Sequence, residues 1–282
     1  MAGLASWVHK EVSMFDFADK TVVVTGGSTG IGAAFASELA RRRARLVLVA
    51  RGEERLRSLA ASLTKAHGVK VDVLAEDLAK PGAAKRVRDA VHGMGLTVDV
   101  LINNAGFASY GPFEALSLET QREEIDLNIG ALVELTHVFL PDLERRQGGV
   151  IQVASTAAFQ AVPFMAVYAA SKAFVLSFSE ALWAEYRDRG VRVLALCPGA
   201  TDTPFFARAG EEAAFGKKAS AEDVVYVGLK AFDANRSHVV HGTGNYLTAL
   251  SSRWFTREFV ARLSARLMRP RTPKILAAQN SR

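Results

Sequence analysis

Two side chains in the middle of the chain have the spacing of a proton-transfer pair. Tyr168 and Lys172 lie four residues apart in the segment Tyr168-Ala169-Ala170-Ser171-Lys172, so a helix would place them on one face. A fixed cation beside a phenol favours the phenolate, which predicts a Tyr168 pKa lowered from about 10 toward neutrality. Such a tyrosine can give a proton to a substrate oxygen or take one from it. Composition alone produces this spacing about 0.2 times per chain, so other residues must support it.

A hydroxyl group is expected near this pair. Ser155 lies thirteen residues before Tyr168 and directly follows Val150–Ala154, an apolar run that is predicted to be a strand. In open sheets of parallel strands, ligands bind at the edge formed by the carboxyl ends of the strands. Ser155 therefore adds a hydroxyl where a ligand would bind.

A glycine-rich turn follows the first predicted strand and opens a helix. Glycine tolerates positive φ and lets the backbone approach a pyrophosphate, while the N-terminus of the helix offers free N–H groups to phosphates. An ordinary strand–helix turn is the alternative, but the position within a β–α–β unit favours a nucleotide site. The residues expected to bind the cofactor here are Gly26, Ser28, Thr29, Gly30, Ile31 and Gly32.

The residue after the second predicted strand bears on the choice of cofactor. An acid at this place would accept hydrogen bonds from the adenosine ribose and favour NAD. The chain instead has Arg51, whose guanidinium can pair with a 2′-phosphate. Unless Arg51 is only a solvated loop residue, the expected cofactor is NADP(H) rather than NAD(H).

Short apolar runs alternate with helical stretches, as in repeated β–α–β units, and most runs are apolar throughout, as in strands buried on both faces of a parallel sheet. The sequence predicts an α/β fold with a doubly wound parallel sheet of about seven strands. One Rossmann-type domain is expected at 20–244, with an N-terminal extension at 1–19 and a basic, amphipathic, helical C-terminal extension at 245–282. The expected strands are Thr21–Thr25, Arg45–Ala50, Val69–Leu74, Val98–Ile102, Val150–Ala154, Val191–Leu196 and His238–His241. The expected helices are Gly30–Arg42, Glu53–Lys65, Gly82–Val91, Leu118–Arg146, Val167–Asp188 and Ala221–Phe232.

Composition excludes several classes of protein. The chain has 282 residues, of which 49% are hydrophobic and 23% charged, so it can bury a large core and long disorder is not expected. Its one cysteine, Cys197, excludes an intrachain disulfide and is interpreted as a small buried hydrophobe. No cluster of His, Cys, Asp and Glu has the spacing of metal ligands, so no metal is expected. With no apolar run near the roughly 20 residues of a spanning helix, a cytoplasmic protein is expected.

The net charge of +6 originates in the C-terminal tail. Residues 251–282 contain eight basic residues and one acid, whereas residues 1–250 contain 27 basic and 28 acidic residues. Nucleic acid is therefore not an expected partner, because its binding needs a basic face on the folded body. Tail residues Phe255, Phe259, Leu263 and Leu267 have helical spacing among arginines. Such a helix could lie peripherally on an anionic membrane, although packing on its own domain or on a second subunit is favoured.

Taken in order, these residues resemble the short-chain dehydrogenase/reductase family, in the branch with a Thr-Gly-x-x-x-Gly-x-Gly loop and a Tyr-x-x-x-Lys active site. The likeness covers about residues 20–242, and Thr25–Gly32 resembles the cofactor loop. Asp77 and Leu78 are similar to the pair whose acid contacts the adenine, and Asn128 falls where the catalytic asparagine lies. Two further segments resemble the motif after the fourth strand and the loop beside the nicotinamide: Asn104, Ala105 and Gly106, then Pro198, Gly199, Thr201 and Thr203.

The resemblance implies hydride transfer between NADP(H) and a carbonyl or secondary alcohol. Tyr168 would be the general acid/base, and Ser155 would hydrogen-bond the substrate oxygen. Lys172 would hold the nicotinamide ribose and lower the Tyr168 pKa, and Asn128 would position a water that links Lys172 to solvent. The expected reaction is reduction of an apolar ketone, such as a 3-oxoacyl or steroid-like compound. Two alternatives remain: an NADP-binding sensor or scaffold without catalysis, and an enzyme resembling sugar-nucleotide epimerases.

Aromatic residues after strand ends predict an apolar substrate pocket. The expected contacts are Phe107, Phe159, Phe164 and Phe205, with Tyr110 and Phe206 nearby. Packing of these loops against the core explains the same residues equally well. The tail could help to close the pocket over a large apolar substrate.

Family members commonly dimerise through two long helices, here 118–146 and 167–188. Many relatives then pair dimers through the last strand, here His238–His241. Because the tail follows that strand and needs space beside it, a homodimer is favoured over a tetramer.

Overall fold

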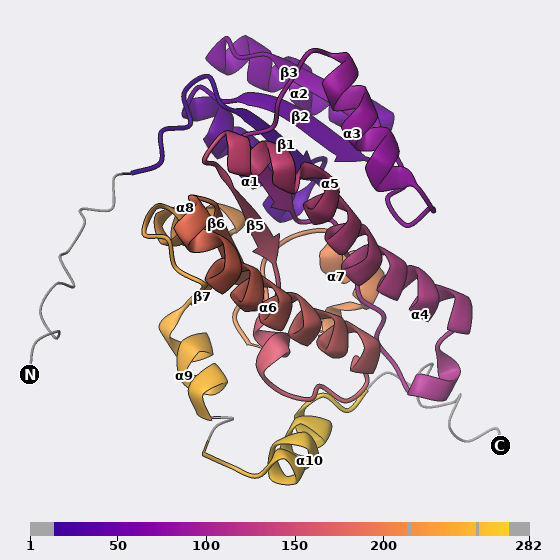
Figure 1. Cartoon of the computed structure of the whole chain (residues 1–282). Coiled ribbons are helices and arrows are strands. Elements are labelled where there is room, and N and C mark those ends of the chain that lie inside the picture. The colour runs from indigo at the N-terminus through magenta and orange to yellow at the C-terminus, as the bar shows by residue number, and fades with distance from the viewer. Residues whose placement is uncertain (1–13, 214–215, 252–253, 271–282) are drawn as a thin grey trace, which may run out of the picture.

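The computed structural model describes residues 14–213, 216–251 and 254–270 (Figure 1). Seven strands form one sheet in the order β3-β2-β1-β4-β5-β6-β7, and all neighbouring strands are parallel. The predicted single-domain, doubly wound α/β fold is confirmed. The strands are β1 (Thr21–Thr25), β2 (Arg45–Ala50), β3 (Val71–Ala75), β4 (Val100–Asn103), β5 (Gly149–Val153), β6 (Arg192–Cys197) and β7 (His238–Val240).

Helices cover both faces of this sheet. Buried side chains of α1, α2 and α8 belong to the hydrophobic cluster on one face, and those of α3 and α5 to the cluster on the other. The helices are α1 (Gly30–Arg41), α2 (Glu53–His67), α3 (Ala83–Gly93), α4 (Leu118–Ile125), α5 (Leu132–Arg145), α6 (Ala166–Tyr186), α7 (Phe205–Ala209), α8 (Ala221–Asp233), α9 (Thr243–Ser251) and α10 (Arg257–Leu267). Figure 1 places α9 and α10 together at one end of the molecule, beyond β7 and α6.

The valine run of β1 shows why the central strands are apolar throughout. Successive side chains of a strand point to opposite faces of the sheet. Val22 and Val24 accordingly pack in the cluster under α1 and α8, and Val23 packs in the cluster under α3 and α5. All five residues of β1 are buried, which fixes its register between β2 and β4.

The predicted single helix 118–146 is divided in the structure. α4 ends at Ile125, a π-helical segment covers Asp126–Ala131, and α5 begins at Leu132. Within this segment the Asn128 side chain accepts a hydrogen bond from the Phe107 N–H (3.1 Å) and donates one to the Phe107 carbonyl (2.9 Å). Single π turns inside α-helices occur frequently at functional sites. Here the π turn carries the predicted catalytic asparagine.

The ends of the predicted domain also differ in detail. Phe15 and Phe17, from the predicted N-terminal extension, are buried and pack against each other and against Phe232 of α8. The predicted boundary at 244/245 falls inside α9. Strands β3 and β4 begin two residues later than predicted. The parts of the two extensions at 1–13 and 271–282 lie outside the described residues.

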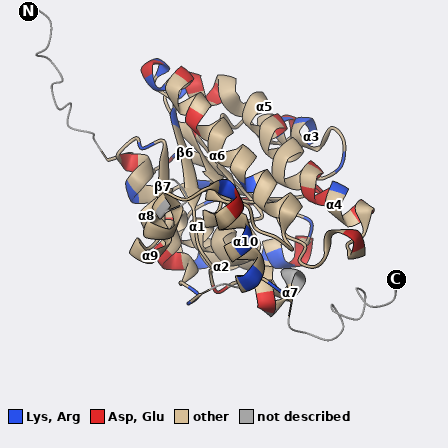
Figure 2. Cartoon of the chain, turned by 90° about the horizontal axis from the view of Figure 1, so that it is seen from below, with Lys and Arg blue, Asp and Glu red and all other residues tan. Residues whose placement is uncertain are grey.

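The described surface is mixed in charge. Figure 2 shows acidic and basic residues interspersed over the helices in that view. No helix among the described residues combines the length and the apolar character needed to cross a membrane.

Candidate active site

A cavity of about 1160 Å³ opens at the carboxyl edge of the sheet. What we call its inner half is lined by the loops after β1 to β5, including Gly26, Arg51, Asp77, Asn104 and Ser155. What we call its outer half is lined by the 160–165 loop, α7, α9, residues 255–268, and the three residues Ala213, Gly216 and Lys217. We count Tyr168 and Lys172 of α6 and the 198–204 loop, which also line the cavity, with the inner half. The cavity therefore occupies the place where ligands bind in open α/β sheets.

The loop after β1 is tied to the loop after β4. The Asn104 Nδ2 donates to the carbonyls of Thr25 (3.0 Å) and Gly26 (3.3 Å), and the Thr25 Oγ1 accepts from the N–H groups of Asn104 and Ala105, both at 3.0 Å. Gly26 and Gly30 have φ of +62° and +56°, a conformation that side chains rarely adopt. The loop and the start of α1 are thereby held open toward the cavity.

Most residues predicted to bind a cofactor line this cavity, and one does not. Gly26, Ser28, Thr29, Gly30 and Ile31 do so, together with Asn104, Ala105 and Gly106 after β4, and Asp77 and Leu78 after β3. Gly32 lies beneath the loop: a Cβ there would stand 2.2 Å from the Gly26 carbonyl oxygen. Gly32 therefore permits close packing of α1 on the loop rather than contact with a ligand.

Arg51 lies at the rim of the inner half. Its side chain is exposed, and its Nη1 forms an ion pair with the Glu123 Oε1 of α4 at 3.3 Å. Arg55, in the first turn of α2, also lines the cavity and was not predicted. Two guanidinium groups therefore stand at the end of the cavity that follows β2, a suitable place for an anionic group.

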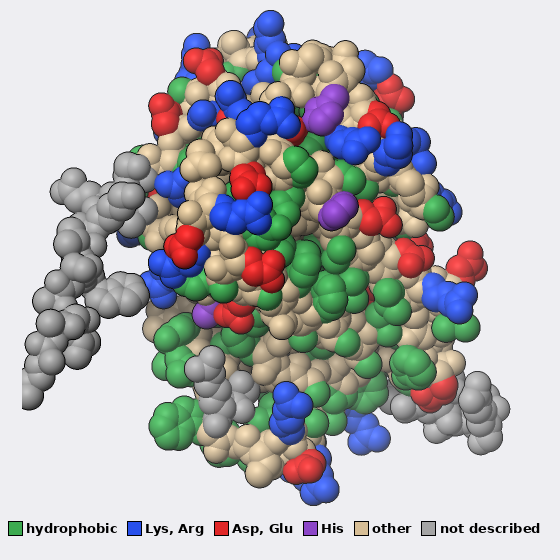
Figure 3. Space-filling view, in the orientation of Figure 1, with side chains coloured by type: hydrophobic (Ala, Val, Ile, Leu, Met, Phe, Trp, Pro, Cys, Tyr) green, Lys and Arg blue, Asp and Glu red, His purple; other side chains and the backbone are tan. Residues whose placement is uncertain are grey.

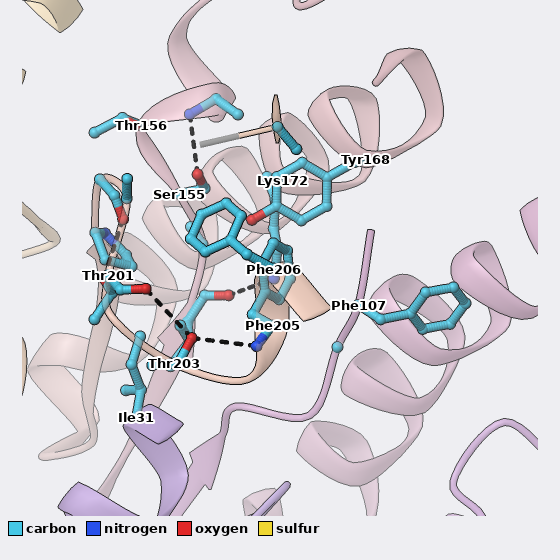
Figure 4. Close-up of a pocket in the computed structure, with 18 of the residues that line it drawn as sticks. Ile31, Phe107, Ser155, Thr156, Tyr168, Lys172, Thr201, Thr203, Phe205 and Phe206 are labelled. Atoms are coloured by element: carbon cyan, nitrogen blue, oxygen red, sulfur yellow. Dashed lines mark hydrogen bonds between the residues drawn. The ribbon is translucent and has the colours of Figure 1, made fainter. Parts of the chain in front are cut away.

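Ser155, Tyr168 and Lys172 converge at the centre of the cavity (Figure 4). Ser155 lies after β5 and caps the following short 3₁₀ turn by accepting the Ala157 N–H at 3.1 Å. The Lys172 Nζ donates to the Val153 carbonyl of β5 at 2.7 Å and lies 5.7 Å from the centre of the Tyr168 ring. The predicted i,i+4 spacing on α6 therefore brings the phenol and the ammonium group to the same wall.

The pKa of Tyr168 moves in the opposite direction to the sequence-based expectation. Burial raises the Tyr168 pKa to about 12, a hydrogen bond with Ser155 partly opposes this, and the charge of Glu124 raises it further. Burial lowers the pKa of Lys172 to about 8, while Cys197 and Glu124 act against that shift. The Tyr168 pKa therefore lies above its ordinary value instead of below it as expected, because desolvation is the largest cause and Lys172 is not among the groups that shift it.

Asn128 supports the site from behind the cavity wall. It is fully buried and does not line the cavity. Its Nδ2 donates to the Ser171 Oγ at 3.1 Å, and the Ser171 hydroxyl donates to the Tyr168 carbonyl at 2.7 Å. A Cβ on Gly106 would stand 2.8 Å from the Asn128 Oδ1 and 3.6 Å from the Lys172 Nζ. Asn128 and Lys172 thus both lie next to Gly106.

The residues predicted for the substrate side divide into two groups. Phe205 lines the cavity with its ring 5.7 Å from the Tyr168 ring, and Phe107 also lines it, although its ring points away from Tyr168 (Figure 4). Phe159 and Phe164 lie outside this cavity: Phe159 faces His238, and Phe164 packs against Tyr110. The residues of the 198–204 loop that were predicted to contact the nicotinamide all line the cavity: Pro198, Gly199, Thr201 and Thr203.

Glu124 is a residue of the site that the sequence reasoning missed. It lies on α4, is fully buried, and accepts hydrogen bonds from the Ser109 N–H (3.1 Å) and the Ser109 Oγ (2.6 Å). It also raises the pKa of both Tyr168 and Lys172. Its position four residues before Asn128 was the available signal, because that spacing predicts a shared helix face.

The remaining polar residues give no sign of a metal centre. Among the described residues, no group of three His, Cys, Asp or Glu side chains could hold a metal ion. Cys197 is buried at the end of β6, and burial raises the pKa of its thiol to about 12.

Several known proteins are similar to this chain. Mouse (Mus musculus) 17-beta-hydroxysteroid dehydrogenase type 3 is 35% identical over 185 residues, which are 64% of this chain and 60% of the mouse protein. A very-long-chain 3-oxoacyl-CoA reductase of Anas platyrhynchos is 35% identical over 182 residues, 62% of this chain and 58% of that protein. The chain thus spans about 60% of the length of these two relatives.

A solved structure extends the likeness to the fold. The short-chain dehydrogenase from Sphingobium yanoikuyae, in complex with NADPH, has 33% sequence identity and a TM-score of 0.75, covering 83% of this chain and 94% of that one. The sequence pattern of the family described as short chain dehydrogenase matches residues 20–214, which contain the glycine loop, Ser155, Tyr168 and Lys172. This chain belongs to the short chain dehydrogenase family.

Proposed function

We propose that this chain is an NADP(H)-dependent oxidoreductase that reduces an apolar ketone to a secondary alcohol. The observation that carries the proposal is the convergence of Ser155, Tyr168 and Lys172 in one cavity with the glycine loop. A protein that only bound the cofactor would not need this proton-transfer set, which argues against a sensor or scaffold.

The residues of the inner half fit a dinucleotide. Gly26 and Gly30 hold the loop at positive φ, and the N-terminus of α1 directs N–H groups toward the cavity. Arg51 and Arg55 favour a cofactor with a 2′-phosphate, as does the NADPH complex of the similar Sphingobium enzyme. When bound, the nicotinamide would supply the hydride to the carbonyl carbon.

The protein's own residues would handle the proton. With a pKa raised to about 12, Tyr168 keeps its proton at neutral pH and can donate it to the carbonyl oxygen. Ser155, which already hydrogen-bonds Tyr168, is placed to orient that oxygen. Lys172 is protonated below about pH 8 and can return a proton to the tyrosinate, since its Nζ lies beside the Tyr168 ring. For Asn128 we propose the role of holding the water through which Lys172 recovers its own proton.

The lining of the outer half supports an apolar substrate. Its lining includes Phe205, Phe206 and Met165, and the names of the two curated relatives denote a hydroxysteroid and a very-long-chain 3-oxoacyl substrate. A ketone with a large hydrocarbon body would therefore find its carbonyl at Ser155 and Tyr168 and its body against apolar side chains.

Replacement of Tyr168 by Phe tests the proposal. Loss of a general acid typically costs a factor of about 10² to 10⁴, so we expect NADPH-dependent ketone reduction to fall by about that factor. NADPH binding, followed by fluorescence titration, should stay within about twofold of the wild type. Tyr226→Phe, at an exposed position of α8, is the matched control.

Two outcomes would contradict the proposal. Near-full activity of the Tyr168→Phe variant would remove the proposed mechanism. A wild-type chain that binds NADPH but reduces none of a panel of apolar ketones would favour the sensor, whereas epimerisation of a sugar nucleotide would favour the second alternative.

We also propose a homodimer formed through α5 and α6. Hydrophobic side chains gather over α6 in the middle of the face shown in Figure 3. Phe174 and Phe178 of α6 stack with ring centres 5.7 Å apart, and Phe174 is exposed. An exposed apolar patch of this kind is typical of an interface. Light scattering of the full chain should give the mass of a dimer, and Phe174→Glu should give a monomer.

A further inference from the structure

The C-terminal helix α10 presents its apolar side to the same cavity as the catalytic residues. Phe259, Val260, Leu263 and Leu267 of α10 line the outer half, as does Phe255 just before it. Their spacing of three and four residues places them on one side of the helix. Arg262 and Arg266 are exposed and do not line the cavity, so the predicted apolar row is separated from its neighbouring arginines in the structure.

This apolar side is not covered by the rest of the described chain. Phe255, Phe259, Leu263 and Leu267 are 54%, 50%, 45% and 48% exposed, whereas the aromatic residues of the core are almost fully buried. Apolar side chains of a helix normally pack against another element of the protein. Here they form a wall of the cavity.

The end of α10 is fixed to the body of the protein. The Tyr110 Oη, on the loop after β4, donates a hydrogen bond to the Met268 carbonyl at 2.8 Å. Met268 itself is buried in a cluster with Tyr110, Met165 and Phe206. At its other end, the Thr256 Oγ1 caps the helix by accepting the Phe259 N–H at 3.3 Å. The helix is therefore anchored at Met268 while its apolar side faces the cavity.

The outer half has few charged side chains in its lining, which favours binding of an apolar group. Among the described residues that line this half, Lys217 is the one charged side chain, and the polar ones are small or neutral, such as Asn245, Thr248 and Ser264. A charged or strongly hydrated substrate would lose much of its hydration there and find few partners in return.

We infer that α10 binds the hydrocarbon body of the substrate and makes the enzyme selective for ketones with a long apolar chain. The reacting carbonyl would lie at Ser155 and Tyr168, and the chain would extend between Phe205 and Phe206 on one side and Phe259 and Leu263 on the other. Selectivity then comes from α10 rather than from the catalytic centre. This inference rests on the proposed ketone reduction.

The test compares methyl ketones from butanone to decanone. The measured quantity is the ratio of kcat/KM for decanone to that for butanone, in the wild type and in the double variant Phe259→Ser, Leu263→Ser. Each apolar contact that is lost in a hydrophobic pocket changes kcat/KM by about tenfold or more, so we expect the ratio to fall at least tenfold. The control Arg262→Ser, Arg266→Ser changes the other side of α10, and its ratio should stay within about twofold of the wild type.

A second variant loosens the helix without changing its apolar side. Tyr110→Phe removes the hydroxyl that donates to the Met268 carbonyl, and the loss of one such hydrogen bond corresponds to a fall of about threefold to tenfold in the same ratio. Calorimetric titration of the cofactor-free chain with decanone gives a readout that is independent of turnover. We expect binding with a negative heat-capacity change, weakened in the Phe259→Ser, Leu263→Ser variant.

The outcomes separate this inference from the proposed function. If the wild type reduces ketones but both variants keep its decanone-to-butanone ratio, the role of α10 is overturned while the reductase stands. If the wild type reduces none, the proposed function fails, and the calorimetric comparison still decides whether α10 binds the hydrocarbon. Equal decanone binding by wild type and double variant would overturn the inference.

Discussion

The inner and outer halves of the cavity are built from different parts of the chain and held by different forces. The inner half follows buried strands, and its polar groups are hydrogen-bonded to the backbone: Asn104 to the glycine loop and Lys172 to β5. The outer half includes α9 and α10, which follow the sheet in sequence, and its apolar side chains on α10 are about half exposed. The comparison indicates that chemistry requires fixed positions at the sheet, whereas recognition of an apolar body requires only a suitable surface.

Two glycine substitutions would test the rigidity of the inner half. In Gly32→Ala, the new Cβ would stand 2.2 Å from the Gly26 carbonyl oxygen. This clash can be relieved only by moving the backbone, which is energetically unfavourable. We expect the free energy of unfolding, measured in urea, to fall by about 3 kcal/mol or more. Gly93→Ala is the matched control at the end of α3, because a Cβ there meets nothing within 4 Å. Gly93→Ala should leave the free energy of unfolding unchanged or raise it by up to about 1 kcal/mol. If both variants change the free energy of unfolding equally, the glycine loop is not rigid.

Burial of Lys172 in the inner half lowers the stability of the fold. Its pKa of about 8 lies below the model-peptide value of 10.5, so burial of the charged form destabilises the fold at neutral pH by up to about 3 kcal/mol. Lys172→Met removes that cost and the hydrogen bond to Val153, which predicts a net gain of about 2 kcal/mol at pH 7 together with loss of activity.

The change of stability with pH tests whether desolvation of Lys172 is what destabilises the fold. As the pH rises from 8 toward 10.5, the folded wild type releases the Lys172 proton while the unfolded chain keeps it, so wild-type stability increases. The advantage of Lys172→Met should therefore shrink between pH 7 and pH 10 in parallel urea titrations. A constant or growing advantage would mean that desolvation is not the cause.

Arg51 should have a smaller and more selective effect, since it is exposed and paired with Glu123. In Arg51→Asp, loss of the phosphate partner predicts a rise of about tenfold or more in the Kd of NADPH and about threefold or less for NADH. Arg57→Asp, an exposed arginine of α2 that does not line the cavity, is the control. Equal changes for both nucleotides, measured by fluorescence titration, would remove the argument for NADP(H).

The smallest effect is expected at the cap of α10. Thr256→Ala removes the hydroxyl that accepts the Phe259 N–H, a change of about 1 kcal/mol for a helix. Since the apolar side of α10 is not buried by the core, we expect faster amide exchange in α10 without a change in global stability. Ser220→Ala removes the same kind of cap from α8, which is packed in the core, and should lower the global free energy of unfolding by about 1 kcal/mol. If Thr256→Ala lowers the global free energy of unfolding, α10 unfolds together with the rest of the protein and is an integral part of the fold.

The strands and most of the inner half could be predicted because their signals are local. Apolar runs such as Thr21–Thr25 and Arg45–Ala50 are the strands β1 and β2 with the predicted bounds. The glycine loop lies between β1 and α1, and the i,i+4 pair Tyr168 and Lys172 shares a wall of the cavity. Sequence spacing suffices where backbone periodicity alone decides which side chains are neighbours.

Other features depend on contacts between distant segments. The division of the predicted helix 118–146 accompanies hydrogen bonds between Asn128 and Phe107, which are 21 residues apart. The placement of Phe159 and Phe164 outside the cavity likewise depends on their neighbours His238 and Tyr110. Periodicity within one segment contains no information about such partners.

By itself, the sequence determined the order of the elements, the sheet edge where the site lies, and the pairing of a phenol with an ammonium group on one helix. Only the tertiary structure decided that Tyr168 holds its proton more firmly than a free tyrosine, that Glu124 acts on the site, and that α10 forms the far wall of the cavity. The physical reason is that spacing along a helix or strand is set by the local backbone, whereas desolvation and cavity walls are set by whichever distant segments pack around a group.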